Sequence, residues 1–424
     1  MSAQFRWKAR YSVLSVLFIT WIVSFIDRTA MSVAIPYIAV DFKLSPLAMG
    51  GVMSAFFAGY SIAQIPGGML ADRFGMRKVS ALALSWWSLF TALTGMVSNL
   101  LHMVVVRVIF GLGEGLFPGC SFKGISVWFP QRERSTANAI MLASNYLGPA
   151  ITPLIVVAIM ASWGWRATFC ILFIPGIITA GLLWLYLRDR PADNNKLSPQ
   201  ELLEIEGNDR TQVQSASKKL TIEQVMQERT VWQCFLVLFF YDLTVKGFSA
   251  WLPSYLVKAR GFNMLHMGMA ASLPYFAGTL CCILGGWISD KFFSNHRRVP
   301  IVATQLLSAL FLYLTCTTNV IGLLVIYQTL TGACLAFFLS TFWALPMNTI
   351  PKAVMGTAGG FINMAGQIAA VVSPLAIGYL VQISKGGFYS AFMFLIGAVL
   401  VSTAIVFTLK EQKAPQGLSV TAKS

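Results

Sequence analysis

The chain has 424 residues, of which 56% are hydrophobic and 11% charged, and its formal net charge is +15. A mean hydropathy of +0.69 excludes an ordinary soluble domain and indicates an integral membrane protein. The seven cysteines form no C-x-x-C pair and no cluster with histidine, so the sequence predicts neither a disulfide framework nor a metal site.

Twelve apolar runs follow one another along the chain, and most are long enough to cross a hydrocarbon core of about 30 Å. In chain order they cover residues 11–36, 46–71, 78–99, 101–125, 135–161, 167–187, 230–257, 264–289, 299–317, 320–345, 354–382 and 387–409. They predict an all-α integral membrane fold with twelve transmembrane helices. The first run resembles a signal peptide, but it continues to Pro36 and is interpreted as an uncleaved spanning helix.

The basic residues fall mostly on one side of these predicted helices. If the N-terminus is inside, the opposite side holds only Lys43, Arg166, Lys258, Arg260 and Lys385. This bias follows the positive-inside rule and predicts that both termini are cytoplasmic. The positive charge is therefore a topology signal, and no nucleic-acid partner is expected.

An internal repeat divides the chain. The loop after the second run, G-G-M-L-A-D-R-F-G-M-R-K, contains Asp72, and the loop after the eighth, G-G-W-I-S-D-K-F-F-S-N-H-R-R, contains Asp290 at an offset of 218 positions (290 − 72). The same offset relates three further pairs: Asn145 and Asn363, Arg28 and Lys246, and Tyr37 and Tyr255. A constant offset across several helices predicts two pseudo-symmetric six-helix bundles.

The bundles are predicted at residues 1–190 and 230–410. Between them, residues 191–229 form a polar cytoplasmic linker, in which S-P-Q-E (198–201) and T-I-E-Q (221–224) are capping boxes that predict short amphipathic helices. Residues 411–424 form a short polar cytoplasmic tail.

The loop after the second run matches the signature G-x-L-A-D-R-x-G-x-R-K of the major facilitator superfamily at every defined position. The stretches F-I-D-R (25–28), R-V-I-F-G-L-G-E-G (107–115) and W-F-P-Q-R-E-R-S-T-A-N-A (128–139) resemble the anion:cation symporters of that superfamily. These include bacterial galactonate, glucarate and hexuronate carriers and the vesicular glutamate and sialic acid carriers. The resemblance implies a transporter. An enzyme is not expected, since the sequence has no metal cluster, nucleophile constellation or nucleotide loop.

The signature loop and its repeat mate are predicted to act as a conformational latch, in which an Asp at a helix end meets cationic side chains. The residues assigned to this latch are Gly68, Asp72, Arg73, Gly75, Arg77, Lys78, Asp290 and Lys291.

The run at 101–125 carries Arg107 and Glu114, which are two helical turns and about 10 Å apart on one face. Gly111, Gly113 and Gly115 have no side chains, so another helix can approach the backbone closely around Glu114. Ionisable groups at membrane depth are costly, so this face should meet the bundle interior or an aqueous cavity. The alternative is a structural ion pair that fixes helix orientation.

Asp27 and Arg28 lie deep in the first run. Neighbours in a helix point about 100° apart, so the two side chains cannot reach the same spot. The resemblance implies that Arg28 binds the substrate carboxylate, that Asp27 and Glu114 exchange protons, and that Arg107 is the charge against which they titrate. Protons are then the coupling ion, and no cofactor is expected.

Lys246, the repeat mate of Arg28, is predicted to be a second anion-binding group; alternatively, it pairs with Asp242 four residues earlier. Polar residues in the middle of other helices are the remaining candidates for substrate binding. They are Tyr60, Asn145, Ser340, Trp343, Asn363 and Gln367. For each Asn the alternative is a hydrogen bond between helices. Similarity to galactonate-type carriers implies that Tyr60, Trp343 and Asn363 line the site. At the position of Asn145, those carriers have the longer residue Gln.

These observations predict a proton-coupled symporter that imports an organic carboxylate by alternating access, with an aldonate or uronate sugar acid as the first choice. The alternatives are a dicarboxylate or aromatic-acid carrier, a proton/organic-anion antiporter, and, in a different class, a transporter-like sensor. The expected partners are the small organic anion and the lipid bilayer. The expected setting is a monomer in the bacterial inner membrane.

Overall fold

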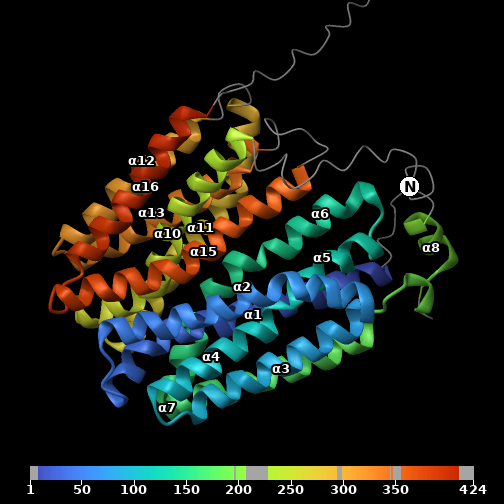
Figure 1. Ribbon diagram of the computed structural model, residues 1–424, viewed down its shortest axis with the longest axis horizontal. Coiled ribbons are helices and arrows are strands. Elements are labelled where there is room, and N and C mark those ends of the chain that lie inside the picture. The colour runs from blue at the N-terminus through green and yellow to red at the C-terminus, as the bar shows by residue number, and fades with distance from the viewer. Residues whose placement is uncertain are drawn as a thin grey trace, which may run out of the picture. The chain divides into compact units, whose positions relative to one another are not determined.

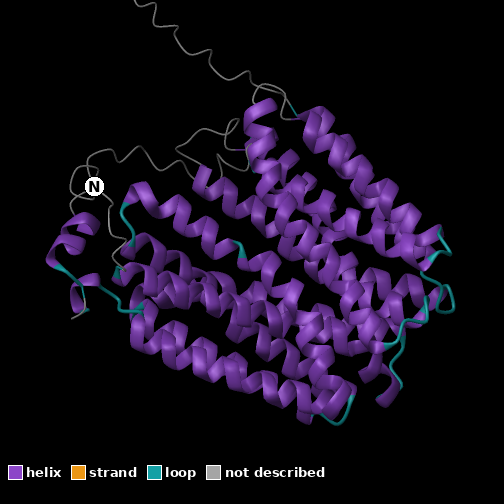
Figure 2. Ribbon diagram, turned by 180° about the vertical axis from the view of Figure 1, so that it is seen from behind, coloured by secondary structure: helices purple, strands orange, loops and turns teal. Residues whose placement is uncertain are grey.

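The computed structural model describes residues 8–194, 197–206, 228–293, 298–343, 345–346 and 355–409. Almost all of these residues are helical, and none of them lies in a strand (Figure 2). Long helices joined by short loops are the architecture expected in lipid, where a helix satisfies its own backbone hydrogen bonds. The all-α prediction is confirmed.

Seven helices build the N-terminal part. They are α1 (Ala9–Asp41), α2 (Pro46–Phe74), α3 (Met76–Met96), α4 (Leu100–Gly115), α5 (Phe117–Trp128), α6 (Gln131–Leu142) and α7 (Ser144–Tyr186). The fourth predicted run is split into α4 and α5 at Leu116, two residues before Pro118, whose missing N–H suits the first turn of a helix. The predicted fifth run covers most of α6 and the first part of α7, and Gly164, with φ of 75°, separates that part of α7 from the predicted sixth span.

The described residues of the C-terminal part form the helices α10 (Arg229–Lys258), α11 (Met264–Phe292), α12 (Arg298–Thr317), α13 (Ile321–Phe342), α15 (Met355–Ile383) and α16 (Tyr389–Thr408). Among the described residues, eleven helical segments are long and apolar enough to span a membrane, and one of them, Gln131–Tyr186, contains the break at Gly164. Counting the two sides of that break separately gives twelve spans in this part of the chain, at nearly the predicted positions.

By packing, the chain divides into two compact units. The first holds the N-terminal helices together with residues 246–276 and 370–391, and the second holds residues 217–245, 277–369 and 392–424. Within the first unit, α1 and α3 lie along α7, and α2 lies along α4 (Figure 1). The boundaries predicted from the repeat, at 190 and 230, stay a prediction. The tail at 411–424 lies outside the described residues.

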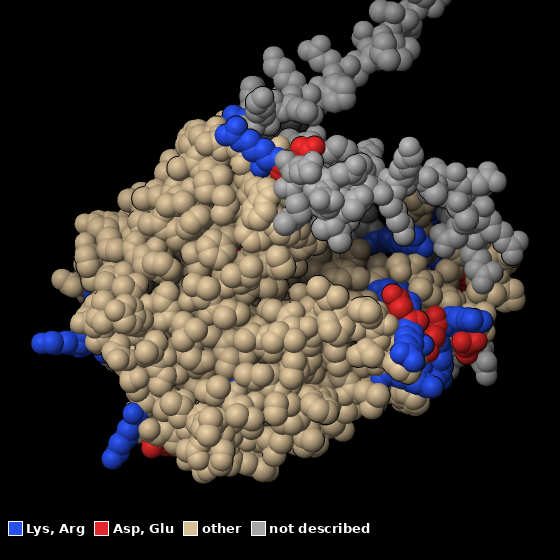
Figure 3. Space-filling view, in the orientation of Figure 1, with Lys and Arg blue, Asp and Glu red and all other residues tan. Residues whose placement is uncertain are grey.

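Much of the molecule's surface is apolar. In Figure 3 the charged side chains gather at helix ends, and the visible surface between them is uncharged. Large apolar residues of the spanning helices are exposed, among them Ile65, Leu82, Ile178 and Ile283. Apolar side chains on such a scale are stable facing lipid rather than water. The protein is a multi-pass membrane protein.

Close contact between α2 and α4 depends on glycine. A Cβ atom added at Gly111 would lie 2.2 Å from the carbonyl oxygen of Phe56, and one at Gly115 would lie 2.4 Å from that of Tyr60. The third glycine of this stretch, Gly113, faces another neighbour, the indole of Trp86 on α3. The predicted close approach of another helix around Glu114 is confirmed. It brings the backbone of α2 directly against the acid-bearing end of α4.

Gly111→Ala is therefore expected to destabilise the first unit. The added methyl group cannot be accommodated against a backbone carbonyl unless α2 and α4 move apart, which costs about 1–3 kcal/mol. The measurement is the thermal unfolding midpoint of the detergent-solubilised protein. Gly181→Ala is the matched control, because nothing lies within 4 Å of a Cβ atom at Gly181. An unchanged midpoint for Gly111→Ala would show that α2 and α4 separate freely.

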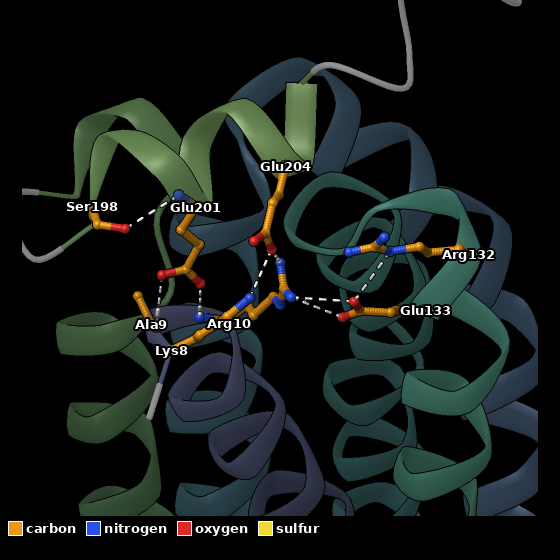
Figure 4. A network of polar contacts seen from close by, with 8 residues as sticks. All are labelled: Lys8, Ala9, Arg10, Arg132, Glu133, Ser198, Glu201 and Glu204. Carbon is orange, nitrogen blue, oxygen red and sulfur yellow. Dashed lines mark hydrogen bonds and ion pairs between the residues drawn. The ribbon is translucent and has the colours of Figure 1, made fainter. Parts of the chain in front are cut away.

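A short helix of the linker is bound to the N-terminal helices. α8 (Pro199–Glu206) begins at the predicted capping box, where the Ser198 hydroxyl accepts from the Glu201 N–H at 3.1 Å. The Glu201 carboxylate in turn accepts from the backbone N–H groups of Ala9 (3.2 Å) and Arg10 (3.1 Å) at the start of α1 (Figure 4). One carboxylate thus caps the positive end of the first spanning helix.

Arg10 extends this contact into an ion-pair network. Its side chain is 1% exposed and contacts Glu204 of α8 at 3.0 Å and Glu133 of α6 at 3.1 Å, while Lys8 reaches Glu204 at 2.7 Å (Figure 4). The hydrogen bonds from Lys8, followed by those from Arg10, lower the pKa of Glu204 below its ordinary value of 4.5. The contribution of Glu204 is therefore fully present above pH 4.5 and is lost as the pH falls through its lowered pKa.

Arg10→Gln is expected to release α8, because it removes a buried guanidinium that joins three helices. The loss should be about 1–2 kcal/mol, since both carboxylate partners remain partly exposed. Hydrogen–deuterium exchange of residues 199–206 would measure the release. Arg190→Gln, at an exposed arginine of the same region, should leave the exchange unchanged; equal exchange in both variants and the wild type would contradict the prediction.

Candidate functional site

A buried cluster of charged residues joins α1 and α4 inside the first unit. The carboxylate of Glu114 is 1% exposed, and its Oε1 atom accepts a hydrogen bond from Arg28 Nε at 2.5 Å. The hydroxyl of Ser24, one turn before Arg28 on α1, donates to the same oxygen. The other oxygen, Oε2, is buried and has no hydrogen-bond partner among the described residues.

Aromatic rings surround the guanidinium of Arg28. Its Cζ atom lies 4.5 Å from the ring centre of Tyr60, 5.0 Å from that of Phe25, 5.3 Å from that of Phe56 and 5.8 Å from that of Trp21. Electron-rich ring faces stabilise a cation where water is scarce. Within the described part of the chain, Nη2 of Arg28 has no hydrogen-bond partner, so the arginine keeps a free donor beside its bond to Glu114.

The second arginine, Arg107, is 2% exposed and lies over the rings of Phe110 (4.5 Å) and Phe56 (5.2 Å). It interacts electrostatically with both Glu114 and Asp27. The direct ion-pair partner of Glu114 is therefore Arg28 of α1. Arg107, which lies on the same face of α4 as Glu114, interacts with it only electrostatically.

Asp27 points away from Arg28, as the angle between neighbouring helical residues predicts. It is 1% exposed, and no described group donates a hydrogen bond to either of its oxygens. Thr91 and Trp87 of α3 lie within interaction range, but the Thr91 hydroxyl donates instead to the Trp87 carbonyl at 3.0 Å. Asp27 is therefore a buried carboxylate whose charge is balanced by Arg107 across space and not by a direct bond.

This arrangement has a clear chemical consequence. The Arg28 guanidinium is the partner of Glu114 and also carries the unused donor Nη2. An incoming carboxylate that bound Arg28 would compete with Glu114 for the same cation. A buried carboxylate that loses its cationic partner is more stable when protonated, because burial disfavours the charged form. Anion binding and proton binding can therefore be coupled at one arginine.

The other predicted binding residues of the first unit are Asn145 and Lys246. Asn145 is half-buried near the start of α7, and Lys246 is half-buried in α10. Asp242, one turn before Lys246, lies against α15 of the second unit, where a Cβ atom at Gly366 would be 2.4 Å from its Oδ2. The roles of Asn145 and Lys246 stay predictions.

In the second unit the predicted selectors lie on or next to two helices. On α13, the half-buried Ser340 donates to the Phe337 carbonyl at 2.8 Å; directly after α13, the half-buried Trp343 packs edge-on against the Phe342 ring. On α15, Asn363 is exposed and Gln367 is half-buried. The spacing of these last two residues by four positions puts them on one helical face.

The signature loop is held by contacts within the first unit. Asp72 pairs with Lys123 of α5 at 2.8 Å, and the same ammonium donates to the Ala71 carbonyl at 2.9 Å. Gly75, with φ of 90°, lies against the Asp189 carboxylate after α7, where a Cβ atom would be 2.5 Å from Oδ2. A side chain at position 75 would meet both backbone strain and this carboxylate.

The remaining latch residues are more dispersed. The Arg77 backbone N–H donates to Asp189 at 2.9 Å, and Gly68 is half-buried. Arg73 and Lys78 are exposed. In the repeat mate, Lys291 lies 4.6 Å from the ring centre of Trp287, and the side chain of Asp290 lies outside the described residues. The latch role stays a prediction.

Long spanning helices, with a buried and partly unpaired charge cluster inside the first unit, are typical of a membrane transporter. The sequence matches the Major Facilitator Superfamily over residues 17–374 and 294–423. The chain belongs to this superfamily, as its signature loop predicted.

Relatives and solved structures agree with this membership. The chain is 32% identical over 399 residues to the probable galactarate/D-glucarate transporter GarP of Escherichia coli, with 88% of each chain covered. It is 33% identical over 411 residues to the probable sulfoacetate transporter SauU of Cupriavidus necator, covering 93% of this chain and 92% of that one. In fold it is similar to an inward-facing bacterial homologue of the human lysosomal transporter Spinster, with a TM-score of 0.78 at 18% identity, covering 96% of this chain and 99% of that one.

Sequence reasoning missed two features of the site. The first is Ser24, which lies four positions before Arg28 and therefore on the same face of α1. That spacing was a signal that could have been used. The second is the ring of Trp21, Phe25 and Phe56 around Arg28. The chain contains 31 phenylalanines and 12 tryptophans, so the sequence alone carried no signal that these particular rings would surround Arg28.

Proposed function

We propose that the protein is a proton-coupled symporter that imports a sugar acid by alternating access. The observation that supports this most directly is the sharing of Arg28: it binds Glu114 through Nε and retains a free Nη2 donor in a buried, aromatic surround. A substrate carboxylate at Arg28 and a proton on Glu114 then favour each other. Cotransport in the same direction follows from that mutual preference.

Asp27 is the second proton carrier in this proposal. It is buried, lacks a direct hydrogen-bond donor among the described residues and shares Arg107 with Glu114. When Glu114 becomes protonated, Arg107 is left to balance Asp27 alone. The two carboxylates are therefore coupled through one guanidinium, and their protons are expected to be exchanged in sequence rather than independently.

The substrate class rests on the relatives and on the distribution of polar groups. Galactarate, D-glucarate and sulfoacetate, which name the two relatives, are all small acids with two anionic groups. A dianion needs a second cation besides Arg28, and Lys246 is the candidate. Tyr60, Asn145, Ser340, Trp343, Asn363 and Gln367 are proposed to select among hydroxylated acids, because amides and hydroxyls both donate and accept.

The membrane setting completes the proposal. Both termini are cytoplasmic, as the distribution of basic residues indicates, and the protein works as a monomer in a bacterial inner membrane. The signature loop, held by Asp72 and Lys123, and its mate around Asp290 serve as the conformational latch between inward-facing and outward-facing states.

Lys246→Ala is expected to weaken the binding of dianionic acids by about tenfold to a hundredfold, with little change for monoanionic acids. The reason is that one charge-assisted contact is worth about 1.5–3 kcal/mol. Competition of unlabelled acids against a transported label would measure it. Lys258→Ala, at the end of the same helix, is the control. Equal affinity of Lys246→Ala and the wild type for every transported anion would show that Lys246 is not a second anion site.

The substrate class is tested by uptake into proteoliposomes across a panel of acids. The panel should contain an aldonate, a uronate, galactarate, D-glucarate, sulfoacetate, an unsubstituted dicarboxylate and an aromatic acid. Uptake of a hydroxylated sugar acid above all others supports the proposal. If uptake of sulfoacetate or of the unsubstituted dicarboxylate were fastest, the substrate would be a small dianion and not a sugar acid. If uptake of the aromatic acid were fastest, the proposed substrate class would be overturned.

A further inference from the structure

Ser24 occupies a special place in the buried cluster. Its side chain is completely buried, and its hydroxyl donates to Oε1 of Glu114, the same atom that accepts from Arg28 Nε. Both donors come from α1 and are one turn apart, so they approach the carboxylate of α4 from one side. Oε2 of Glu114 is buried and has no partner in the described part of the chain.

The two oxygens of Glu114 are therefore not equivalent. Oε1 already accepts two hydrogen bonds, which stabilise negative charge on that atom. A proton that bonds to a lone pair of Oε2 gives a neutral carboxyl group whose carbonyl oxygen, Oε1, still accepts from Ser24. Protonation at Oε1 would instead break at least one of the two existing bonds. The geometry favours Oε2 as the atom that gains and loses the proton.

We propose that Ser24 is a positioning residue for proton transfer: its hydroxyl holds Oε1 of Glu114 throughout the cycle, so that Oε2 remains the protonated atom after Arg28 has turned to the substrate. This inference rests on the proposed symport. It adds a residue that touches neither the substrate nor the proton and that decides how the proton-carrying group is oriented.

The need for a second anchor follows from the sharing of Arg28. When a substrate carboxylate occupies the guanidinium, Glu114 loses its cationic donor and would be free to rotate. The Ser24 hydroxyl is neutral and does not compete for the anion, so it keeps its bond. The other charged or titratable groups facing this carboxylate are Asp27 of α1, Tyr60 of α2 and Arg107 of α4, and Ser24 adds no charge to this balance.

Infrared difference spectroscopy at two pH values tests the inference directly on the full-length protein in membranes. The carbonyl band of protonated Glu114 is assigned by its absence in Glu114→Gln. In Ser24→Ala this band is expected at higher wavenumber, because its carbonyl oxygen loses a hydrogen bond. Its titration midpoint should move up by about one pH unit, because the anion loses one of its two donors. Ser24→Thr, which keeps the hydroxyl, should restore both values.

Transport supplies the second readout. In Ser24→Ala, proton-driven uptake is expected to fall about tenfold at neutral pH while the substrate concentration for half-maximal exchange stays unchanged. Ser121→Ala is the matched control, because its equally buried hydroxyl donates at 2.9 Å to the Pro118 carbonyl of its own region. If Ser24→Ala does not insert stably, Ser24→Cys retains the volume with a weaker donor and should show the same shifts at smaller size.

The outcomes separate the two proposals. A Glu114 band that neither moves nor titrates differently in Ser24→Ala or Ser24→Cys would overturn the role of Ser24, whatever the transport data show. A wild type whose uptake does not respond to a proton gradient would overturn the symport, while the infrared band would still decide whether Ser24 orients Glu114.

Discussion

Glu114→Gln is expected to abolish uphill accumulation of substrate under a proton gradient while leaving downhill exchange of labelled for unlabelled substrate. Glutamine keeps the size of the side chain and an oxygen that can accept from Ser24 and Arg28, but it cannot take up a proton. The loss of accumulation should be at least a hundredfold. Counterflow in proteoliposomes measures exchange, and pH-driven uptake measures coupling.

The control for Glu114→Gln is Glu228→Gln, at an exposed acid just before α10, which should transport like the wild type. If Glu114→Gln also lost substrate exchange and its unfolding midpoint fell, the carboxylate would be a structural partner of Arg28. That outcome would support the alternative hypothesis that Arg107 and Glu114 are structural charges that fix the orientation of the helix.

Arg28→Lys is expected to eliminate both uptake and exchange, with a loss of about a hundredfold or more in apparent affinity. The guanidinium presents a planar set of donors, so Nη2 can bind an incoming carboxylate before Nε leaves Glu114. A lysine ammonium is a single point charge and cannot reproduce that exchange of partners. Ligand-induced thermal stabilisation and uptake would measure the loss.

Arg166→Lys is the matched control, since Arg166 donates to the Val97 carbonyl at 2.7 Å at the end of α3, away from the cluster. It should leave affinity unchanged. Normal affinity in Arg28→Lys, with loss of pH dependence alone, would show that Arg28 acts on the proton and that another group binds the anion.

The fold was largely predictable because each spanning helix is specified locally. An apolar run of sufficient length forms a helix in lipid regardless of its neighbours, so the predicted ranges lie within a few residues of the observed helices. The departures have local causes. Pro118 interrupts the fourth span at Leu116, and Gly164 allows the sharp break inside α7 with positive φ.

The site was less predictable because its geometry depends on how the helices rotate against each other. Periodicity placed Arg107 and Glu114 on one face of α4, but it could not say that α1 would bring Arg28 and Ser24 to Glu114 first. Periodicity did predict that Asp27 and Arg28 would face different partners, because the angle between them is fixed by the helix itself.

In the proposed function, protons drive the uptake of an organic anion through the cluster of Arg28, Glu114 and Asp27. The most direct measurement is the initial rate of labelled galactarate or D-glucarate uptake into proteoliposomes under an inward proton gradient, an inward sodium gradient, or neither. Substrate is expected to accumulate with the proton gradient, to leak out again when a protonophore is added, and not to accumulate in Glu114→Gln. Acceleration of uptake by sodium alone, with none by protons, would overturn proton coupling.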